Sequence, residues 1–214
     1  MFVPAHYREP DVSWMVDLMR GNPLALMASN GSATEGPFAT HLPVITDPHW
    51  EELPAANLSG MPLLGHMNRA NPHWAALESG TAILLTFTGP HAYVSPSVYD
   101  ITPAAPTWNF TSVHVHGVVE KIESTEETLS VVQATVQAFE KEFGNSWDMT
   151  ESLGYFHKIV PAVGAFRVRV NRAEGMFKLS QEQRPEVRER VVRSFAGRGC
   201  TRHAQTADLM DRLS

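Results

Sequence analysis

The chain has 214 residues, 43% of them apolar, and a formal net charge of −6. This length fits one domain, or one domain with an appended subdomain, and the apolar content suffices for a packed core. No apolar run is long enough to span a bilayer, and the first residues lack the pattern of a secretory signal, so we expect a cytoplasmic protein without membrane partners. The single cysteine, Cys200, excludes an internal disulfide and a zinc site built on paired cysteines.

The N-terminal part of the chain predicts one helix and two strands. Pro10 and Asp11 precede an apolar helical pattern, which Gly21-Asn22-Pro23 ends. Residues 24–29 predict a short apolar strand, and Asn30-Gly31 indicates a turn. The next strand is expected over residues 37–46 (PFATHLPVIT), where Thr40 and His41 interrupt the apolar pattern. This polar pair fits either an ordinary edge strand or a contact with a ligand.

A candidate anion site follows a Pro-, Asn- and Ser-rich loop over residues 47–60 and a strand over residues 61–67 that carries His66. In NRANPHWAAL, Asn71 is expected to cap a helix that begins at Pro72. The first turn of a helix exposes unpaired N–H groups, and Arg69 lies two residues before the cap. The stretch is the best local candidate for a phosphate site, but most such helix starts bind only water.

The middle of the chain, residues 81–121, places Thr, His, Ser, Trp and Asn among apolar β-type runs on either side of a Pro-rich connection. Two interpretations fit a strand over residues 108–117: a barrel interior with hydrogen-bonded histidines, or a wall against a planar ligand. A metal site is a weaker third interpretation, because these motifs lack an Asp or Glu. One strand face carries alternate residues, namely Trp108, Phe110, Ser112, His114 and His116.

A long helix is expected after the central strands. Ser124 has capping-box spacing to Glu127 before a long helix over residues 129–143, with an apolar stripe expected in the core. The stripe consists of Val132, Val136, Phe139 and Phe143.

The second half of this region predicts a short helix and two strands. The helix is expected around residues 155–159, and residues 163–170 alternate as a strand with Arg167 and Arg169 on one face. Glu174-Gly175 indicates a turn before a last short strand over residues 176–179.

Basic residues gather at the C-terminal end. Residues 1–166 carry 6 Lys and Arg against 17 Asp and Glu, whereas residues 167–214 carry 11 against 6. Helices are expected over residues 185–195 and 207–213. The long stretch between these helices argues against a helix-turn-helix. The basic segment therefore fits DNA contact, a solvated face or a dimer contact.

The element pattern predicts an α+β fold, mainly β. Several strands with inserted and appended helices, and no βαβ rhythm, favour a barrel or curled sheet. The sequence has no GxGxxG after a strand, no P-loop, no HExxH and no GxSxG, which disfavours dinucleotide-binding, nucleotide-hydrolysing and hydrolase classes.

Five segments resemble the PaiB family of flavin-binding split-barrel proteins and together cover nearly the entire chain. A sixth, VHVHGVVEKI (113–122), is similar to pyridoxamine-phosphate oxidase relatives, in which an Arg and an acidic residue replace His114 and His116. This difference argues against a direct transfer of oxidase chemistry. The five segments are FATHLP (38–43), GHMNRANPHW (65–74), FTGPHAYVSPSVY (87–99), PTWNFTSVHVHG (106–117) and FKLSQ (177–181).

The resemblance implies an FMN-binding split β-barrel over residues 1–180 with a basic helical extension over residues 181–214. It also implies a bacterial homodimer that holds FMN, or a related planar small molecule, in a groove between subunits, whether or not the flavin survives purification. PaiB proteins are described as negative transcriptional regulators, so we expect ligand or redox state at the groove to alter how the extension contacts DNA. The alternatives are a flavin-dependent oxidoreductase acting on a small molecule and a haem-binding split-barrel protein, and no catalytic residue is assigned.

The residues that suit FMN lie in these motifs. Arg69 and the helix start suit the phosphate, and Thr40 and His41 are expected to donate to the phosphate or the ring edge. Asn109 and His114 lie on opposite strand faces, so only a groove between subunits brings both to one ligand. The full expected set is Thr40, His41, His66, Arg69, Asn71, Asn109, His114, Lys178 and Gln181.

Overall fold

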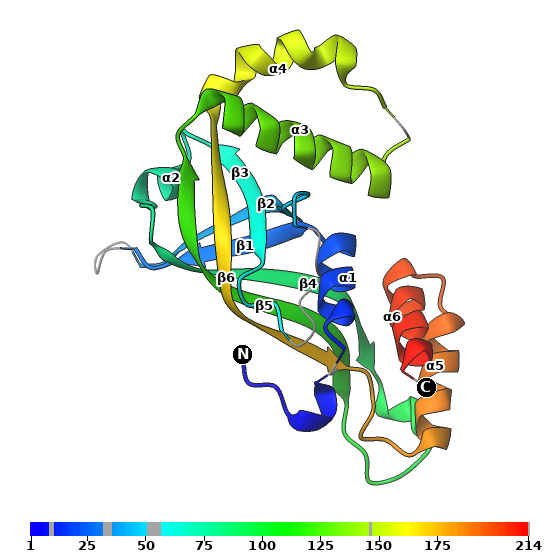
Figure 1. The fold of residues 1–214 in the computed structure, drawn as a ribbon. Coiled ribbons are helices and arrows are strands. Elements are labelled where there is room, and N and C mark those ends of the chain that lie inside the picture. The colour runs from blue at the N-terminus through cyan, green and yellow to red at the C-terminus, as the bar shows by residue number, and fades with distance from the viewer. Residues whose placement is uncertain (9–10, 32–35, 51–56, 146, 214) are drawn as a thin grey trace. The chain divides into compact units, whose positions relative to one another are not determined.

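The structure is a computed structural model that describes residues 1–8, 11–31, 36–50, 57–145 and 147–213 (Figure 1). Pro10 and residues 51–56 of the loop lie outside the described residues. The chain divides into two compact units: unit 1 contains residues 1–18, 88–113 and 174–214, and unit 2 contains residues 19–87 and 114–173. None of the helices in the described part of the chain has the length and apolar character needed to cross a membrane.

Six strands form a closed barrel in the order β1-β2-β3-β6-β5-β4 (Figure 1). The pairs β1–β2, β1–β4, β2–β3 and β3–β6 are antiparallel. The architecture confirms the predicted α+β split barrel. The strands are β1 (Leu24–Ser29), β2 (Phe38–Thr46), β3 (Pro62–Asn68), β4 (Ala82–Val94), β5 (Thr107–Ile122) and β6 (Val163–Lys178).

The alternation of side chains along β6 is the one that the sequence predicts. Phe166 and Val168 are buried inside the barrel, while Arg167 and Arg169 point outward. Gly65 of β3 pairs with Phe166, and a Cβ on Gly65 would lie 2.6 Å from the phenyl ring. The glycine therefore lets the ring occupy the barrel interior.

The predicted turn at Glu174-Gly175 is wrong, because β6 runs through both residues without a break. A Cβ on Gly175 would lie 2.8 Å from side-chain atoms of Met15 and Phe177, so this glycine permits close packing within an extended strand. Glu174 binds the N-terminal ammonium group of Met1 at 2.5 Å.

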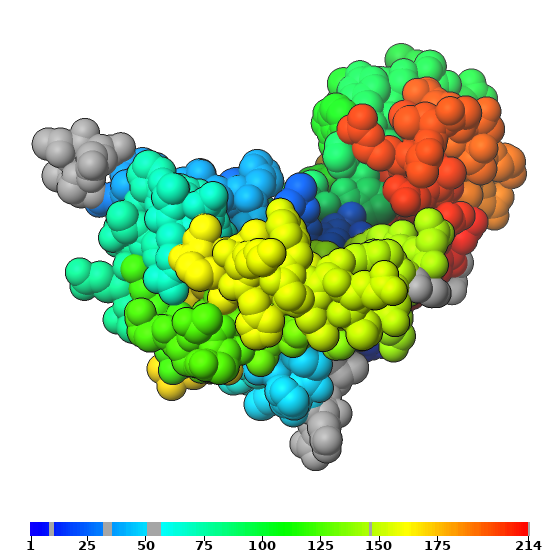
Figure 2. All heavy atoms as spheres, turned by 90° about the horizontal axis from the view of Figure 1, so that it is seen from above, coloured from blue at the N-terminus to red at the C-terminus, as the bar shows by residue number. Residues whose placement is uncertain are grey.

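The helices of unit 2 lie on both faces of its sheet. They are α2 (Pro72–Ala76), α3 (Thr125–Glu142) and α4 (Leu153–Ile159), with 3₁₀ turns at η3 (Thr150–Ser152) and η4 (Val160–Ala162). α3 packs against Ala165 of β6, whereas α2 places Trp74 against Gly164, the neighbouring residue on the opposite strand face. In space-filling form, α3 and α4 form the middle of the surface of unit 2 that faces the viewer (Figure 2). α3 contacts β2 and β3. Val131 of α3 packs in one buried cluster with Ile45, Leu64, Ile122 and Ala165.

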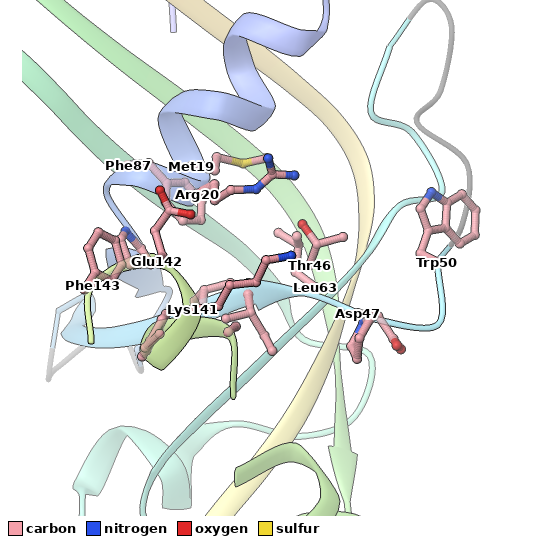
Figure 3. A pocket seen from close by; sticks show the side chains of 16 residues that line it. Met19, Arg20, Thr46, Asp47, Trp50, Leu63, Phe87, Lys141, Glu142 and Phe143 are labelled. Carbon is pink, nitrogen blue, oxygen red and sulfur yellow. The ribbon is translucent and has the colours of Figure 1, made fainter. Parts of the chain in front are cut away.

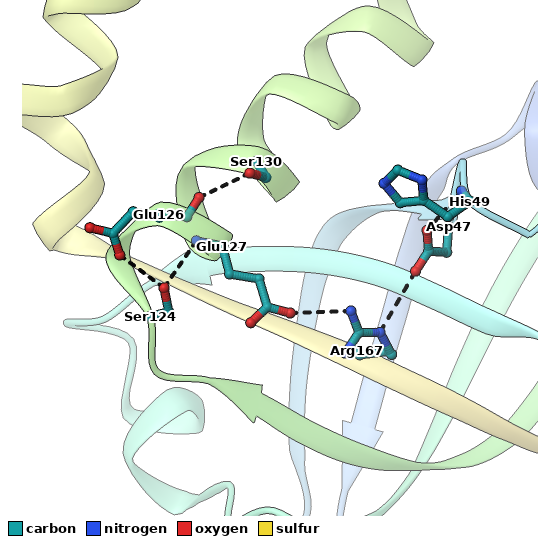
Figure 4. Close-up of polar contacts among 7 residues, drawn as sticks. All are labelled: Asp47, His49, Ser124, Glu126, Glu127, Ser130 and Arg167. Carbon is teal, nitrogen blue, oxygen red and sulfur yellow. Dashed lines mark hydrogen bonds and ion pairs between the residues drawn. The ribbon is translucent and has the colours of Figure 1, made fainter.

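The start of α3 is fixed by polar contacts (Figure 4). The Ser124 hydroxyl accepts a hydrogen bond from the Glu127 N–H at 3.2 Å, which confirms the predicted cap. The Glu127 side chain does not complete a capping box; its carboxylate lies 3.2 Å from Arg167. Arg167 also lies 3.7 Å from the buried carboxylate of Asp47, so one guanidinium joins β6 to α3 and to the end of β2.

Most of the apolar stripe on α3 belongs to the core. Val132 is buried and the partly buried Phe139 packs against the core cluster, whereas Phe143 has 55% of its surface exposed. The prediction of a core stripe is therefore wrong for Phe143, which lines a cavity together with Phe139.

Unit 1 contains the C-terminal helices α5 (Pro185–Ala196) and α6 (Thr201–Arg212), the first part of α1 (Ser13–Gly21), and the 3₁₀ turns η1 (Ala5–Tyr7) and η2 (Pro96–Val98). α6 begins six residues earlier than predicted, and residues 197–200 connect it to α5. The segment TRHAQT lacks an apolar period, which hid this start from sequence reasoning. Cys200 immediately precedes α6 and is exposed.

Several arginines of the basic segment hold the C-terminal helices to the rest of unit 1. Arg188 donates to the carbonyl of Met210, and Arg190 donates to the carbonyls of Val98 and Tyr99. Arg212 lies 2.9 Å from the Asp17 carboxylate and stacks over Trp14 with its guanidinium carbon 4.3 Å from the ring centroid.

Candidate cofactor site

The helix start expected to bind phosphate is present, but α2 has only five residues. Asn71 caps it, because the side-chain oxygen accepts the His73 N–H at 2.9 Å. A single short turn gives a small helix dipole, and this N–H is already bonded. Positive charge at this place therefore comes from side chains rather than from the helix end.

His73 joins two strands to α2 through a hydrogen-bonded network. Its Nε2 lies 2.9 Å from Ser29 Oγ and its Nδ1 lies 2.9 Å from Thr40 Oγ1. Asn71 Nδ2 donates to Thr40 Oγ1 at 3.3 Å. The imidazole is 1% exposed and stacks with Phe38, with ring centroids 5.4 Å apart. Burial lowers the pKa of His73, so the neutral imidazole donates from one nitrogen and accepts at the other.

Two cations meet at Trp74, the next residue of α2. Lys121 Nζ donates to the Trp74 carbonyl at 2.9 Å and lies 4.4 Å from the ring centroid. Arg69 has its guanidinium carbon 5.5 Å from the same centroid, and its Nε donates to the Val163 carbonyl at 2.9 Å. A Cβ on Gly164 would lie 2.5 Å from the indole ring, so only glycine leaves room for Trp74 there.

Of the nine expected ligand residues, Thr40, Arg69 and Asn71 lie together around α2. His41 is exposed and, as the next residue of β2, points to the opposite strand face. His66 shares a strand face with Leu64, which packs in the α3 core cluster. Its Nδ1 has no hydrogen-bond partner within the described residues, and burial lowers the pKa of His66.

Three expected ligand residues belong to unit 1 and bond within it. Asn109 is fully buried and exchanges two hydrogen bonds of 3.0 Å with Ser180, while its Nδ2 also contacts Met210 Sδ at 3.3 Å. Lys178 donates to Thr107 Oγ1. Gln181 accepts the Leu179 N–H at 2.6 Å and donates to the Phe177 carbonyl. These contacts give all three residues a structural role in unit 1.

The histidine face of β5 lies on the outside of the barrel. Val113 and Val115 are fully buried, whereas His114 and His116 are half-buried on the opposite face. The interpretation of a histidine-lined barrel interior is therefore wrong. His116 Nε2 lies 3.2 Å from Arg172 Nη2. The described residues contain no group of three or more His, Cys, Asp or Glu side chains placed to hold a metal ion.

Sequence reasoning missed four residues of the α2 cluster: Ser29, His73, Trp74 and Lys121. His73 and Trp74 directly follow the predicted cap in NPHW, so their place in this motif could have marked them as members of the cluster. Lys121 stands in a β-type run far along the chain, and a serine ending an apolar strand is typical of an ordinary turn.

The donors around α2 suit a phosphate ester. Toward the described residues, Arg69 bonds through Nε and keeps its terminal guanidinium nitrogens, and Lys121 keeps ammonium protons beyond its bond to the Trp74 carbonyl. Thr40 and Asn71 add a hydroxyl and an amide. Guanidinium and ammonium groups bind phosphate oxygens through charge-assisted hydrogen bonds. The side chains present therefore fit the phosphate end of a flavin mononucleotide.

The chain is similar to proteins of bacteria and fungi. It is 26% identical over 218 residues to "Protease synthase and sporulation protein PAI 2" of Bacillus subtilis, covering 99% of this chain and 97% of that protein. It is 25% identical over 232 residues to an uncharacterized protein of Emericella nidulans, covering 93% and 92% of the two chains. The similarity therefore extends over whole chains and beyond bacteria.

Solved structures share the fold at low sequence identity. The FAD and heme binding protein from Mycobacterium smegmatis superimposes with a TM-score of 0.56 at 14% identity, covering 86% of this chain and 78% of that one. The flavocytochrome Anf3 from Azotobacter vinelandii gives a TM-score of 0.51 at 18% identity, covering 79% and 68%.

Residues 1–172 match a family model whose description is "Putative FMN-binding domain". This description indicates FMN as the cofactor, in agreement with the phosphate donors around α2. The match spans most of the chain, and the chain therefore belongs to this FMN-binding domain family.

Proposed function

We propose that the protein is an FMN-binding negative transcriptional regulator of the PaiB type, acting in the cytoplasm as a homodimer that senses ligand or redox state in a groove between subunits. The main support is the placement of Arg69 and Lys121 at Trp74, beside the Thr40–Asn71–His73 network. Similarity to the Bacillus subtilis sporulation protein over 99% of the chain supports the regulatory output.

In this proposal each residue around α2 has a separate task. Arg69 and Lys121 hold the FMN phosphate, while Thr40 and Asn71 orient it by hydrogen bonds. His73 holds the Thr40 hydroxyl in position, because its Nδ1 bonds to Thr40 and its Nε2 bonds to Ser29. Bound FMN supplies reversible redox chemistry, which the protein positions.

The experiment that tests flavin binding compares FMN with riboflavin, which lacks the phosphate. We expect the wild type to bind FMN at least tenfold more tightly, a ratio of about 1.4 kcal/mol that one charge-assisted contact supplies. Arg69→Ala and Lys121→Ala should lose most of this preference and leave riboflavin affinity unchanged. Binding is measured by flavin fluorescence and by the visible spectrum of the purified protein.

Arg169→Ala is the matched control, because Arg169 is exposed on β6 of the same unit. Equal affinities for FMN and riboflavin in the wild type would contradict the phosphate role of Arg69 and Lys121. A haem-type spectrum, or a colourless protein that does not bind added FMN, would contradict flavin binding itself.

Sedimentation of the purified protein tests the homodimer. A monomer at micromolar concentration would contradict a ligand groove between two subunits.

We assign flavin binding to residues 1–180 and DNA contact to residues 181–214. The sequence argument against a helix-turn-helix fails, because only residues 197–200 separate α5 from α6. Arg184, Arg193 and Arg198 are exposed, and the 3.6 Å pair of Arg193 with Glu189 is a weak surface contact. These three arginines are the groups we expect to reach phosphates.

Fluorescence anisotropy with DNA from upstream of the protein's own gene tests this assignment. Each of Arg184→Ala and Arg198→Ala should weaken binding and reduce the slope of log affinity against log salt by about one. Arg169→Ala again serves as the control. Unchanged slopes in both variants would place the DNA contact elsewhere.

A further inference from the structure

A cavity of about 490 Å³ lies in unit 2, apart from the α2 cluster. The ends of α1, β2 and α3 surround it, together with residues of β3 and β4 (Figure 3). None of the residues proposed to hold FMN lines it. Its volume is within the range of small-molecule sites in proteins.

The floor of the cavity is apolar and its rim is aromatic. Phe87 and Leu63 are almost fully buried at the floor, with 1% and 2% of their surface exposed. Phe143 and Trp50 stand at the rim with 55% and 39% exposed. Large aromatic side chains left open to solvent around an apolar hollow indicate a surface that binds an apolar group. This accounts for Phe143, the exposed end of the α3 stripe.

Two cationic side chains converge on the hollow. Arg20 comes from the last turn of α1 and Lys141 from the last turn of α3, and the Lys141 side chain extends across the opening toward Thr46 (Figure 3). A cation in the last turn also suits the helix dipole, but the dipole does not require both helices to end at one cavity. Neither cation has an ion pair among the described residues.

Two cations and two carboxylates line the cavity. Asp47 lines it but is paired with Arg167, so Glu142 is the remaining acid against Arg20 and Lys141. An apolar hollow with two cationic side chains directed at its opening fits a ligand that has an apolar body and one anionic end.

We propose that this cavity is a second ligand site, which binds a small amphipathic carboxylate. The apolar body lies against Phe87 and Leu63 under the Phe143 ring, and the carboxylate lies between Arg20 and Lys141. The site is independent of FMN.

Calorimetric titration with 4-phenylbutyrate and its neutral isostere 4-phenylbutanamide tests the proposal, with and without saturating FMN. We expect the wild type to bind the acid at least about fivefold more tightly than the amide, the upper range for an exposed ion pair. The double variant Arg20→Gln/Lys141→Gln should bind both equally. Phe143→Ala should weaken both, and its exposure makes an effect on folding small. Lys158→Gln, an exposed change on α4, is the control.

Equal binding of acid and amide by the wild type, or no binding of either, would overturn the proposal. So would an acid preference that survives in the double variant, because the cations would then play no part. FMN affinity should stay at the wild-type value in all cavity variants. A loss of FMN binding there would show that the cavity belongs to the flavin site, which overturns its independence but leaves flavin binding intact.

Discussion

Asn109 illustrates how one buried amide is fixed by its surroundings. It exchanges hydrogen bonds with Ser180 and touches Met210, with none of its surface exposed. We expect Asn109→Ala to lower the free energy of unfolding by about 2 kcal/mol, because Ser180 loses its buried partner and a cavity remains. Urea unfolding followed by circular dichroism measures this change.

Asn145→Ala, at an exposed position, should leave the stability unchanged. FMN affinity separates the structural role of Asn109 from the ligand role expected from sequence. If Asn109→Ala abolished flavin binding without lowering stability, the ligand role would be restored.

His73 makes stability depend on pH. Burial holds the pKa of His73 in the folded protein below the value of about 6.5 in the unfolded chain. The unfolded state therefore binds more protons below pH 6.5, so stability is full above that pH and is lost as pH falls toward the folded pKa. We expect the unfolding free energy to fall between pH 7.5 and pH 5.5, and to fall less in His73→Gln.

The same urea titrations at the two pH values check this result, with His157→Gln on the exposed face of α4 as the control. His66 should add to the decrease in unfolding free energy on acidification, because burial also lowers the pKa of His66. An unfolding free energy that rises on acidification would contradict the buried neutral state of both rings.

At the scale of elements, α2 depends on a strand beside it. Gly164→Ala places a Cβ 2.5 Å from the Trp74 ring, so the indole has to move. We expect a loss of about 1–3 kcal/mol of stability from overpacking. FMN affinity should fall as well, because Arg69 and Lys121 are arranged around that ring. Thermal unfolding and flavin titration measure the two effects.

Gly154→Ala is the matched control on α4, where a Cβ meets nothing within 4 Å. Alanine in a helix should raise its stability by up to about 1 kcal/mol. Normal FMN affinity in a destabilised Gly164→Ala protein would separate Trp74 from the flavin site.

Elements with strong local signals could be predicted from the sequence, and those fixed by distant contacts could not. β1 agrees residue for residue with its apolar run, and the caps at Asn71 and Ser124 are as expected. Gly175 carried a turn signal, but packing against Met15 and Phe177 keeps it in a strand. In the candidate site, Arg69 and Asn71 stood in one motif, whereas Lys121 reaches α2 only through the barrel pairing.

Across the whole molecule, charge in the sequence is not the same as charge at the surface. Residues 167–214 carry 11 Lys and Arg against 6 Asp and Glu, an excess of five. Arg188, Arg190 and Arg212 direct their guanidinium groups to partners within unit 1. Part of the basic segment thus stabilises unit 1, which composition alone could not reveal.

The C-terminal helices are a part of the fold rather than a detachable tail. Truncation after Arg198 removes α6 with its buried Met210, together with the packing of α6 on α5 and of His203 on the buried Phe195. We expect a loss of more than about 4 kcal/mol, since each such side chain contributes about 1.5–3 kcal/mol by burial. Thermal unfolding of the shortened chain measures this loss.

The control is the single substitution Gln205→Ala, at an exposed position on α6, which should leave the unfolding temperature unchanged. A truncated protein that unfolds at the wild-type temperature would contradict the packing described for α6.

Cys200 stands exposed between α5 and α6, and the sequence contains no second cysteine. A maleimide dye or nitroxide will therefore attach at this one position in the native sequence, without prior removal of other thiols. Such a label reports from the junction of the two helices proposed to contact DNA. Changes in its emission or spin mobility on adding FMN would then follow in real time whether the flavin signal reaches the C-terminal helices.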